Sequence, residues 1–173
     1  YLVGIIFNGS CKNDVIFITS KTFSESSNLL NELNLTNMPF STENGALLYF
    51  PKNRFKKIKN SSDYDKYCKI RIAKLSSKNW HQFLLKKQKK FKLLIAQDLP
   101  SKILKKYTNL DNTSKMLNRE ASQIILWEDS LVNLKKFKNE LKSEKQGVLI
   151  QGSRFMQVSS VCNKRIAKKL ISH

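Results

Sequence analysis

Basic and aromatic side chains are interleaved in one short segment of the chain, residues 49–59. Tyr49, Phe50 and Phe55 lie among five basic residues, which are Lys52, Arg54, Lys56, Lys57 and Lys59. Aromatic rings can stack on unpaired bases while ammonium and guanidinium groups hold phosphates. We therefore predict that the basic residues of this segment contact phosphate, whereas Tyr49 and Phe50 are predicted to end a buried strand.

The segment after this one alternates apolar and basic residues from Cys68 to Leu75. Side chains on a strand point to opposite faces in turn. Ile70 and Ile72 are therefore predicted to face the core, and Lys69, Arg71 and Ala73 to face outward. Such a strand would present one positively charged face.

A long helix is predicted from about residue 77 to Gln97, with Lys86, Lys89 and Lys90 on its outer side. Reading of base edges usually requires Arg, Asn or Gln. Only Gln82 and Gln88 meet this requirement between Trp80 and Leu94. The helix is therefore predicted to contact the phosphate backbone and to read little sequence.

A basic terminal helix is predicted over residues 163–172. Its Lys164 and Arg165 are a third candidate group. They fit a phosphate contact, a localisation signal or an ordinary solvated helix face, and the sequence leaves these three open.

Residues suited to catalysis or metal binding are few and scattered. The histidines are His81 and His173, and the cysteines, which are odd in number and form no Cys-x-x-Cys pair, are Cys11, Cys68 and Cys162. A structural zinc site needs four clustered Cys or His ligands. We therefore predict no metal, no cofactor and no disulfide framework, and we expect a chain that is not an enzyme.

A metal-dependent nuclease is the minor alternative. Asp63 and Asp65 precede the strand that carries Lys69 and Arg71. Two-metal chemistry needs several converging carboxylates, and the chain has only 13 acidic residues. The sequence therefore favours binding over cleavage.

The formal net charge is +19, and it is unevenly distributed. Residues 1–51 hold two lysines against four acids, and residues 52–173 hold the other 30 basic residues against nine acids. Self-repulsion on this scale disfavours the compact state unless a counter-charged partner relieves it. An excess of lysine that only keeps the protein soluble, or that reflects a biased coding sequence, is the plainer interpretation.

The order of predicted elements indicates an α+β fold with a mainly antiparallel sheet. Strands are predicted at residues 1–7, 15–19 and 45–50, the first two as an antiparallel hairpin. A helix capped by Ser24 follows the second strand, and another runs from about Ser130 to Ser143. We expect one domain over residues 1–173, with a near-neutral part before residue 52 and a strongly basic part after it.

These observations predict a domain that binds DNA or RNA through lysine contacts with the phosphate backbone. It would be intracellular, in the nucleus or in a mitochondrial or other ribonucleoprotein assembly, with other protein subunits as further partners. The alternative is a scaffold domain whose basic face meets an acidic protein. No apolar run approaches the ~20 residues that span a bilayer, so no membrane association is expected.

Overall fold

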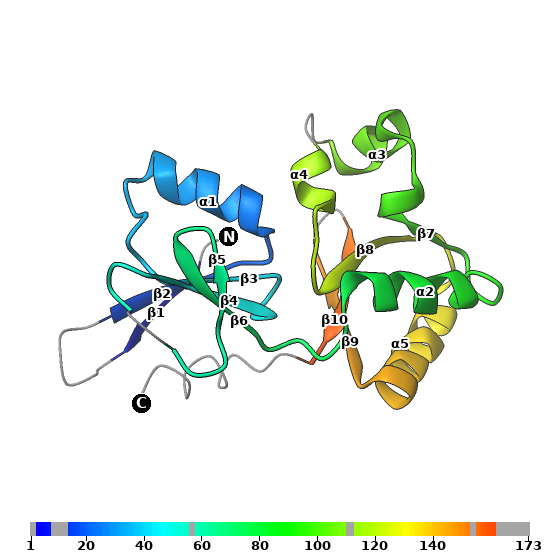
Figure 1. The fold of residues 1–173 in the computed structure, drawn as a ribbon. Coiled ribbons are helices and arrows are strands. Elements are labelled where there is room, and N and C mark those ends of the chain that lie inside the picture. The colour runs from blue at the N-terminus through cyan, green and yellow to red at the C-terminus, as the bar shows by residue number, and fades with distance from the viewer. Residues whose placement is uncertain (1–2, 8–13, 56–57, 110–112, 153–154, 162–173) are drawn as a thin grey trace. The chain divides into compact units, whose positions relative to one another are not determined.

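The structure is a computed structural model that describes residues 3–7, 14–55, 58–109, 113–152 and 155–161 of the 173-residue chain. The sequence predicts one domain, whereas the structure has two compact units, with the boundary between Ala73 and Lys74. Each unit has its own sheet and core (Figure 1). The change in charge after residue 51 falls inside unit 1, at the end of one of its strands.

Unit 1 is a six-stranded mixed sheet with one helix. In chain order its elements are β1 (Val3–Phe7), β2 (Asp14–Ile18), α1 (Phe23–Glu32), β3 (Phe40–Thr42), β4 (Leu47–Pro51), β5 (Ser62–Tyr64) and β6 (Tyr67–Arg71). The strand order is β1-β2-β3-β4-β6-β5. β2 and β3 are parallel and the other neighbouring strands are antiparallel. The predicted α+β class and the predicted β1–β2 hairpin are therefore confirmed.

Both faces of this sheet are apolar. On the face that α1 covers (Figure 1), Phe23 of the helix packs against aromatic side chains of the sheet, which are Phe40, Tyr49, Tyr64 and Tyr67. The opposite face buries Leu48, Phe50, Cys68 and Ile70, with Phe55, Ile58 and Ile72 packed against them. Tyr49 and Phe50 are thus core residues, as predicted. Ala73, which was predicted to face outward, is buried; it lies beyond the end of β6, and its backbone N–H donates to Ala46 O.

Unit 2 is a four-stranded antiparallel sheet with helices on both faces. Its elements are α2 (Ser77–Lys87), β7 (Leu93–Ile95), the 3-10 turn η1 (Ala96–Asp98), α3 (Ser101–Thr108), α4 (Ser114–Leu117), β8 (Ser122–Trp127), α5 (Leu131–Lys145), β9 (Gly147–Gln151) and β10 (Met156–Ser160). The strand order is β7-β8-β10-β9. α2 and α5 cover one face through Trp80, Phe83, Leu84, Phe137 and Leu141. Leu104 of α3 and Met116 of α4 pack with Ile124 on a second, smaller core.

The long helix predicted up to Gln97 is wrong beyond Lys87. A turn follows α2, and residues 93–95 form β7 instead, paired with β8. Phe91, Leu93 and Ile95 are all buried. Burial of every second residue is the pattern of a strand with one covered face. Ladder hydrogen bonds to β8 and burial of these side chains outweigh the helical preference of a lysine-rich segment. β3, β5 and β10 were not predicted from the sequence.

No helix in the described part of the chain is long and apolar enough to cross a membrane.

Gly147 begins β9 where the strand passes close to two helices. A Cβ atom there would lie 2.7 Å from Trp80 Cη2 and 2.8 Å from Leu141 Cδ1. Both neighbours belong to the core of unit 2, so neither can move away easily.

We predict that Gly147→Ala lowers the free energy of unfolding of unit 2 by about 1–3 kcal/mol through overpacking. Chemical denaturation would measure the loss. Lys145→Ala, an exposed change two residues earlier, should stay within about 0.5 kcal/mol of the unchanged protein, and an equal effect of the two variants would contradict the packing explanation.

Asp129 joins the start of β7 to the start of α5. Its carboxylate accepts hydrogen bonds from the backbone N–H of Lys92 (3.0 Å), from Asn133 Nδ2 (2.8 Å) and from the backbone N–H of Ser130 (2.7 Å). These bonds, that from Lys92 foremost, lower the pKa of Asp129 below its usual value.

A carboxyl group whose pKa is lower in the folded state contributes stability above its unfolded pKa and loses it as the pH falls through the folded value. We predict that Asp129→Asn lowers the thermal unfolding midpoint at pH 7. The difference between the variant and the unchanged protein should narrow below about pH 4, the usual range of an aspartate. A difference that stays constant from pH 7 to pH 3 would show that the charge of Asp129 does not stabilise unit 2.

Candidate active site

The basic residues proposed from the sequence in unit 1 mostly contact the protein itself. Lys52 Nζ lies 3.5 Å from a carboxylate oxygen of Asp63. Arg54 donates to Asn37 O at 3.2 Å and lies over the ring of Phe55. Lys69 Nζ lies 4.1 Å from the ring centroid of Tyr64, and Arg71 donates to Ala73 O at 3.3 Å. Lys59 is exposed, and Lys56 and Lys57 lie outside the described residues.

The candidates on the lysine-rich helix belong to unit 2. Lys90 forms an ion pair with Glu140 of α5, which also binds Lys87 at 2.7 Å. These two hydrogen bonds, that from Lys87 foremost, lower the pKa of Glu140. Lys86 and Lys89 are exposed and line a shallow hollow on α2 with Gln82 and Leu85. Lys164, Arg165 and the predicted terminal helix lie outside the described residues.

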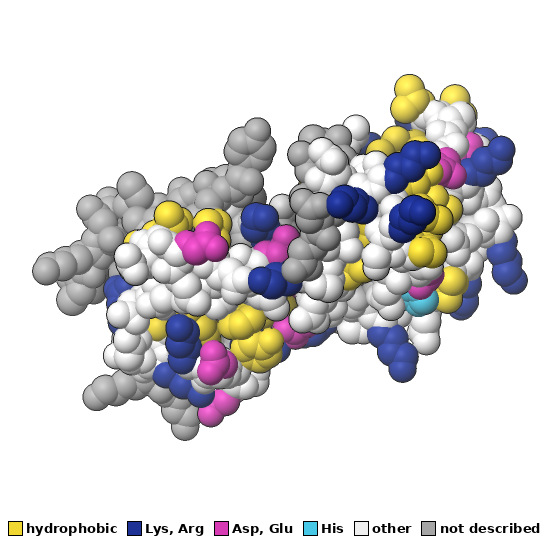
Figure 2. Space-filling model, turned by 90° about the horizontal axis from the view of Figure 1, so that it is seen from above, with side chains coloured by type: hydrophobic (Ala, Val, Ile, Leu, Met, Phe, Trp, Pro, Cys, Tyr) yellow, Lys and Arg dark blue, Asp and Glu magenta, His cyan; other side chains and the backbone are white. Residues whose placement is uncertain are grey.

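The candidate residues are thus divided between two units, and Lys52 and Lys90 among them pair with acids. On the face drawn in Figure 2, Lys and Arg side chains form separate groups with other side chains between them.

Among the described residues, Asp63, Asp65 and His81 are not grouped as metal ligands. The side chain of Asp63 is 86% exposed and pairs with Lys52, and Asp65 occupies a left-handed turn position. His81 Nε2 lies 2.8 Å from one carboxylate oxygen of Asp98. No group of three or more His, Cys, Asp and Glu side chains that could hold a metal ion occurs among the described residues.

A different set of polar residues gathers at the carboxyl ends of the parallel pair β2 and β3. Because α1 carries the chain from β2 back to the start of β3, both strands end at the same edge of the sheet. The residues that follow them are Thr19, Ser20, Lys21 and Thr22 after β2, and Glu43 and Asn44 after Thr42, the last residue of β3. In open sheets, ligands bind outside the carboxyl ends of parallel strands. We call Thr19, Ser20, Lys21, Thr22, Thr42 and Glu43 the strand-end cluster.

Backbone hydrogen bonds hold the two loops of the cluster together. Glu43 N donates to Lys21 O at 3.0 Å, and Asn44 N donates to Thr19 O at 2.9 Å. Glu43 and Asn44 have positive φ angles, 50° and 60°. This conformation is uncommon for a residue such as glutamate and is found where the surrounding structure imposes it, often at functional sites. The Glu43 side chain is buried, with 1% of its surface exposed.

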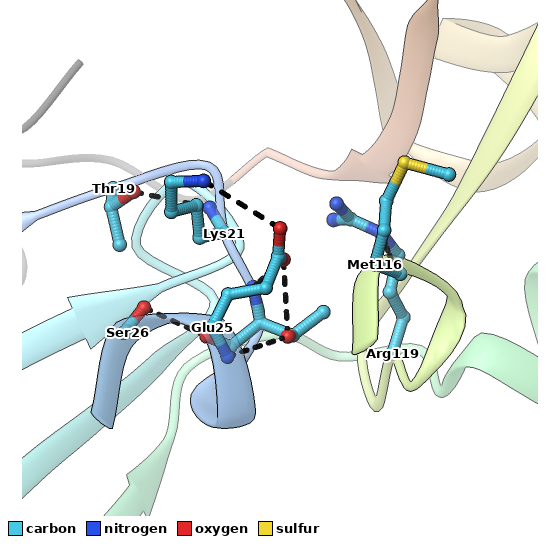
Figure 3. Close-up of polar contacts among 7 residues, drawn as sticks. Thr19, Lys21, Glu25, Ser26, Met116 and Arg119 are labelled. Carbon is cyan, nitrogen blue, oxygen red and sulfur yellow. Dashed lines mark hydrogen bonds and ion pairs between the residues drawn. The ribbon is translucent and has the colours of Figure 1, made fainter. Parts of the chain in front are cut away.

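The first turn of α1 forms one wall of the cluster (Figure 3). Thr22 is the N-cap: its Oγ1 accepts from Glu25 N at 3.4 Å, and Glu25 Oε2 accepts from Thr22 N at 2.9 Å. Lys21 Nζ lies 3.6 Å from Glu25 Oε1. Its backbone N–H donates to Thr19 Oγ1. The cap predicted at Ser24 is wrong, since Ser24 lies inside the helix.

Two buried hydroxyl groups at the end of β3 have no hydrogen-bond partner among the described residues. They are Ser41 Oγ and Thr42 Oγ1, and both residues are completely buried. A buried hydroxyl without a partner costs free energy unless water or a ligand completes its bonding. Thr42 adjoins Glu43 in the cluster, so it is a group that a bound ligand could satisfy.

Figure 3 also includes a buried arginine of unit 2. Arg119 donates from Nε to Met116 O at 3.0 Å and from Nη1 to Ser122 Oγ at 3.1 Å. These contacts join the end of α4 to the start of β8.

Reasoning from the sequence missed the strand-end cluster. A Thr-Ser-Lys-Thr run directly after a strand and before a helix is a usable signal, and so is Glu-Asn-Gly after a short strand. Neither run indicates a site by itself. The site depends on the parallel pairing of β2 and β3, and β3 was not predicted from the sequence.

The fold is similar to that of a solved structure. No family model matches the chain. The crystal structure of TM0651 from Thermotoga maritima matches with a TM-score of 0.55 and 13% sequence identity, over 94% of this chain and 62% of that chain. The chain therefore spans less than two thirds of the length of this neighbour. TM0651 is a HAD-like hydrolase-family protein of the Cof type.

This similarity corrects the prediction of function. The nucleic-acid-binding domain expected from the charge is contradicted, because the chain is similar in fold to TM0651, a hydrolase-family protein. The similarity conflicts only weakly with the expectation that the chain is not an enzyme. The physical reason is that the net charge reports composition, whereas the structure distributes the lysines over two units and pairs several of them with acids.

The cap of α1 can be tested directly. We predict that Thr22→Ala destabilises unit 1 by about 1 kcal/mol, because it removes the acceptor for Glu25 N. Ser24→Ala, two residues further on, should change stability by less than about 0.5 kcal/mol. Urea denaturation of both variants would measure these effects. If Ser24→Ala were the more damaging change, the cap would lie where the sequence analysis put it.

Proposed function

We propose that the chain forms part of a hydrolase-type enzyme in which the strand-end cluster holds an oxyanion group of the substrate, such as a phosphoryl group. The observation that carries this proposal is the meeting of polar loops at the carboxyl ends of β2 and β3. The similarity in fold to a HAD-like hydrolase-family protein supports a reaction at this site rather than binding alone.

The chemistry of the cluster suits an oxyanion. Thr19 and Thr42 bring hydroxyl groups, of which Thr42 Oγ1 has no partner among the described residues, and Lys21 brings a positive charge. The start of α1 adds the positive end of a helix dipole, which favours negative charge. Charge-assisted hydrogen bonds of this kind are about twice as strong as neutral ones.

Lys21 is able to change partner at little cost. Its pair with Glu25 is 3.6 Å long, and the Lys21 side chain is 44% exposed. Exposed pairs of this kind contribute about 0–1 kcal/mol. A bound oxyanion would therefore draw Lys21 away from Glu25 without loss of the cap, because Glu25 keeps its hydrogen bond to Thr22 N.

Glu43 gives the cluster its buried acidic group. Its backbone is fixed by the bond to Lys21 O, so its carboxylate position is coupled to the loop that carries Lys21. In the proposed site, Glu43 acts as a positioning residue for that loop.

The test measures binding of orthovanadate, a phosphate analogue, to the whole chain by isothermal titration calorimetry. We expect Lys21→Gln to weaken binding by about tenfold or more, since a hydrogen bond to a charged group contributes about 1.5–3 kcal/mol. Lys59→Gln is the matched control, because Lys59 is an exposed lysine of unit 1 outside the cluster. Binding is the primary measurement, because the chain covers only part of the length of its neighbour.

A second measurement follows turnover of p-nitrophenyl phosphate. Turnover that falls in parallel with vanadate affinity in Lys21→Gln supports the proposed hydrolase. Absence of saturable vanadate binding, or an equal loss in Lys59→Gln, would remove the strand-end cluster as the site.

A further inference from the structure

The sheet of unit 2 ends in a strand whose outer edge is open. The strand order β7-β8-β10-β9 places β9 (Gly147–Gln151) at one end of the sheet, where it pairs with β10 on one side only. Its sequence, Gly-Val-Leu-Ile-Gln, contains no charged residue and no proline. Edge strands are usually short, covered, charged or interrupted by proline, because an open edge can pair with another strand.

The hydrogen bonds at the two ends of the β9–β10 pair show how the backbone of β9 is oriented. Gly152 N donates to Phe155 O at 3.0 Å, and Val161 N donates to Gln146 O at 3.3 Å. Residues 146 and 152 therefore turn their backbone groups toward β10. In an antiparallel pair this orientation recurs at every second residue.

The same alternation continues through β9 itself. Val148 and Ile150 bond to β10, so the N–H and C=O groups of Gly147, Leu149 and Gln151 point to the open edge. None of these outward groups has a hydrogen-bond partner among the residues that the structure describes. Each of these residues therefore presents one donor and one acceptor to a further strand.

Two other sheet edges of the protein are protected. β7, at the opposite end of the same sheet, has three residues, and the carbonyl of its Leu93 accepts from Gln88 Nε2 at 3.1 Å. β5, an edge of the unit 1 sheet, also has three residues and includes Asp63, which pairs with Lys52. β9 has five residues and neither kind of protection. Of these three edges, that of β9 is suited to accept a further strand.

The outward groups of β9 are arranged symmetrically about Leu149. Two copies of β9 can lie antiparallel, with Leu149 opposite Leu149 of the second copy and Gly147 opposite Gln151 of the second copy. All outward residues then occupy hydrogen-bonded positions, in which the two facing residues exchange both N–H···O bonds. A two-fold axis relates the copies, which is the commonest symmetry of protein dimers.

The side chains of β9 fit the same register. Gly147 has no side chain to obstruct Gln151 of the second copy. Val148 lies opposite Ile150 of the second copy, and both are half-buried in the single chain. Apolar, β-branched pairs across neighbouring strands stabilise a sheet. Leu149 packs against the core that α2 and α5 cover, so the strand is ordered before a second copy arrives, which lowers the cost of association.

We propose that β9 is an interface at which two copies of this chain join their unit 2 sheets edge to edge. β9 carries no basic side chain that would hold an acidic peptide, whereas its backbone groups match those of a second β9. The net charge of +19 opposes the association of two copies. Salt screens this repulsion and therefore strengthens the dimer. The inference stands on unit 2 alone, so it does not depend on what the strand-end cluster binds.

The test measures the mass of the whole chain by sedimentation equilibrium over a range of concentrations. One pair of five-residue strands is a small interface compared with the roughly 1,200 Å² that the smaller stable interfaces bury, so we expect a Kd on the order of 10–100 µM. The Kd should fall at least about twofold when the salt is raised from about 50 to 500 mM.

Two changes at one position separate backbone pairing from side-chain effects. Gln151→Pro removes an N–H that points to the open edge and none that bonds β10, and proline is tolerated at such positions of an edge strand. The dimer contains the change twice, so we expect the Kd to rise about tenfold or more. Gln151→Ala keeps the N–H and is the matched control, with a Kd within about twofold of that of the unchanged chain.

A second variant leaves the backbone intact. Val148→Lys places a charge opposite Ile150 of the second copy, and lysine on an edge strand is a common protection against pairing. We expect the Kd to rise about tenfold or more in this variant as well. Circular dichroism checks that both variants are folded.

Hydrogen exchange locates the interface residue by residue. In the dilute chain, the amides of Val148 and Ile150 should exchange slowly and those of Leu149 and Gln151 rapidly. Raising the concentration above the Kd should slow exchange at Leu149 and Gln151 only.

Three results would overturn the proposal. The first is a chain that stays monomeric at about ten times the expected Kd. The second is a dimer that persists equally in Gln151→Pro and Gln151→Ala, because the copies would then meet at another surface. The third is slow exchange at Leu149 and Gln151 in the dilute monomer, because another part of the same chain would then cover the edge.

Discussion

The parallel pairing of β2 with β3 is the constraint on which the candidate active site depends. Phe17 N donates to Pro39 O and Thr19 N donates to Ser41 O, and these bonds fix the two strands side by side. Only a parallel pair brings two carboxyl ends to one edge of a sheet. If β3 ran the other way, Glu43 and Lys21 would lie at opposite edges, and the hydroxyls at the end of β3 would face a different loop.

Local patterns predicted much of the fold. Val15-Ile16-Phe17-Ile18 is β-branched and aromatic, and the strand there is confirmed, as is the helix that begins after Ser130. The failures were at places where long-range contacts decide. Phe91, Leu94 and Ile95 fit a helical spacing, whereas Phe91, Leu93 and Ile95 fit a strand spacing, and pairing with β8 selected the strand. β3 has only three residues, too few for a pattern, so the parallel pair could not be foreseen.

The candidate site was harder to predict than the fold, because its residues are ordinary. Thr, Ser and Lys are common in this chain, and the Thr-Ser-Lys-Thr run around Lys21 indicates a site only once the parallel pairing of β2 and β3 is known. The net charge instead favoured the lysine-rich segments as the binding residues. Charge counts ignore which acids lie nearby in space, and Glu140 lies about 50 residues from both lysines that it binds. The composition of a chain therefore says little about where its unpaired charge lies.

The distribution of aromatic residues gives each unit its own optical signal. Both tryptophans, Trp80 and Trp127, belong to unit 2. Unit 1 has none, and its covered face is a cluster of phenylalanine and tyrosine rings around Phe23. Tryptophan emission therefore reports on the folding of unit 2, and the near-ultraviolet dichroism of tyrosine reports mainly on unit 1. The two units can be observed separately in one unmodified sample, without labels or dissection of the chain.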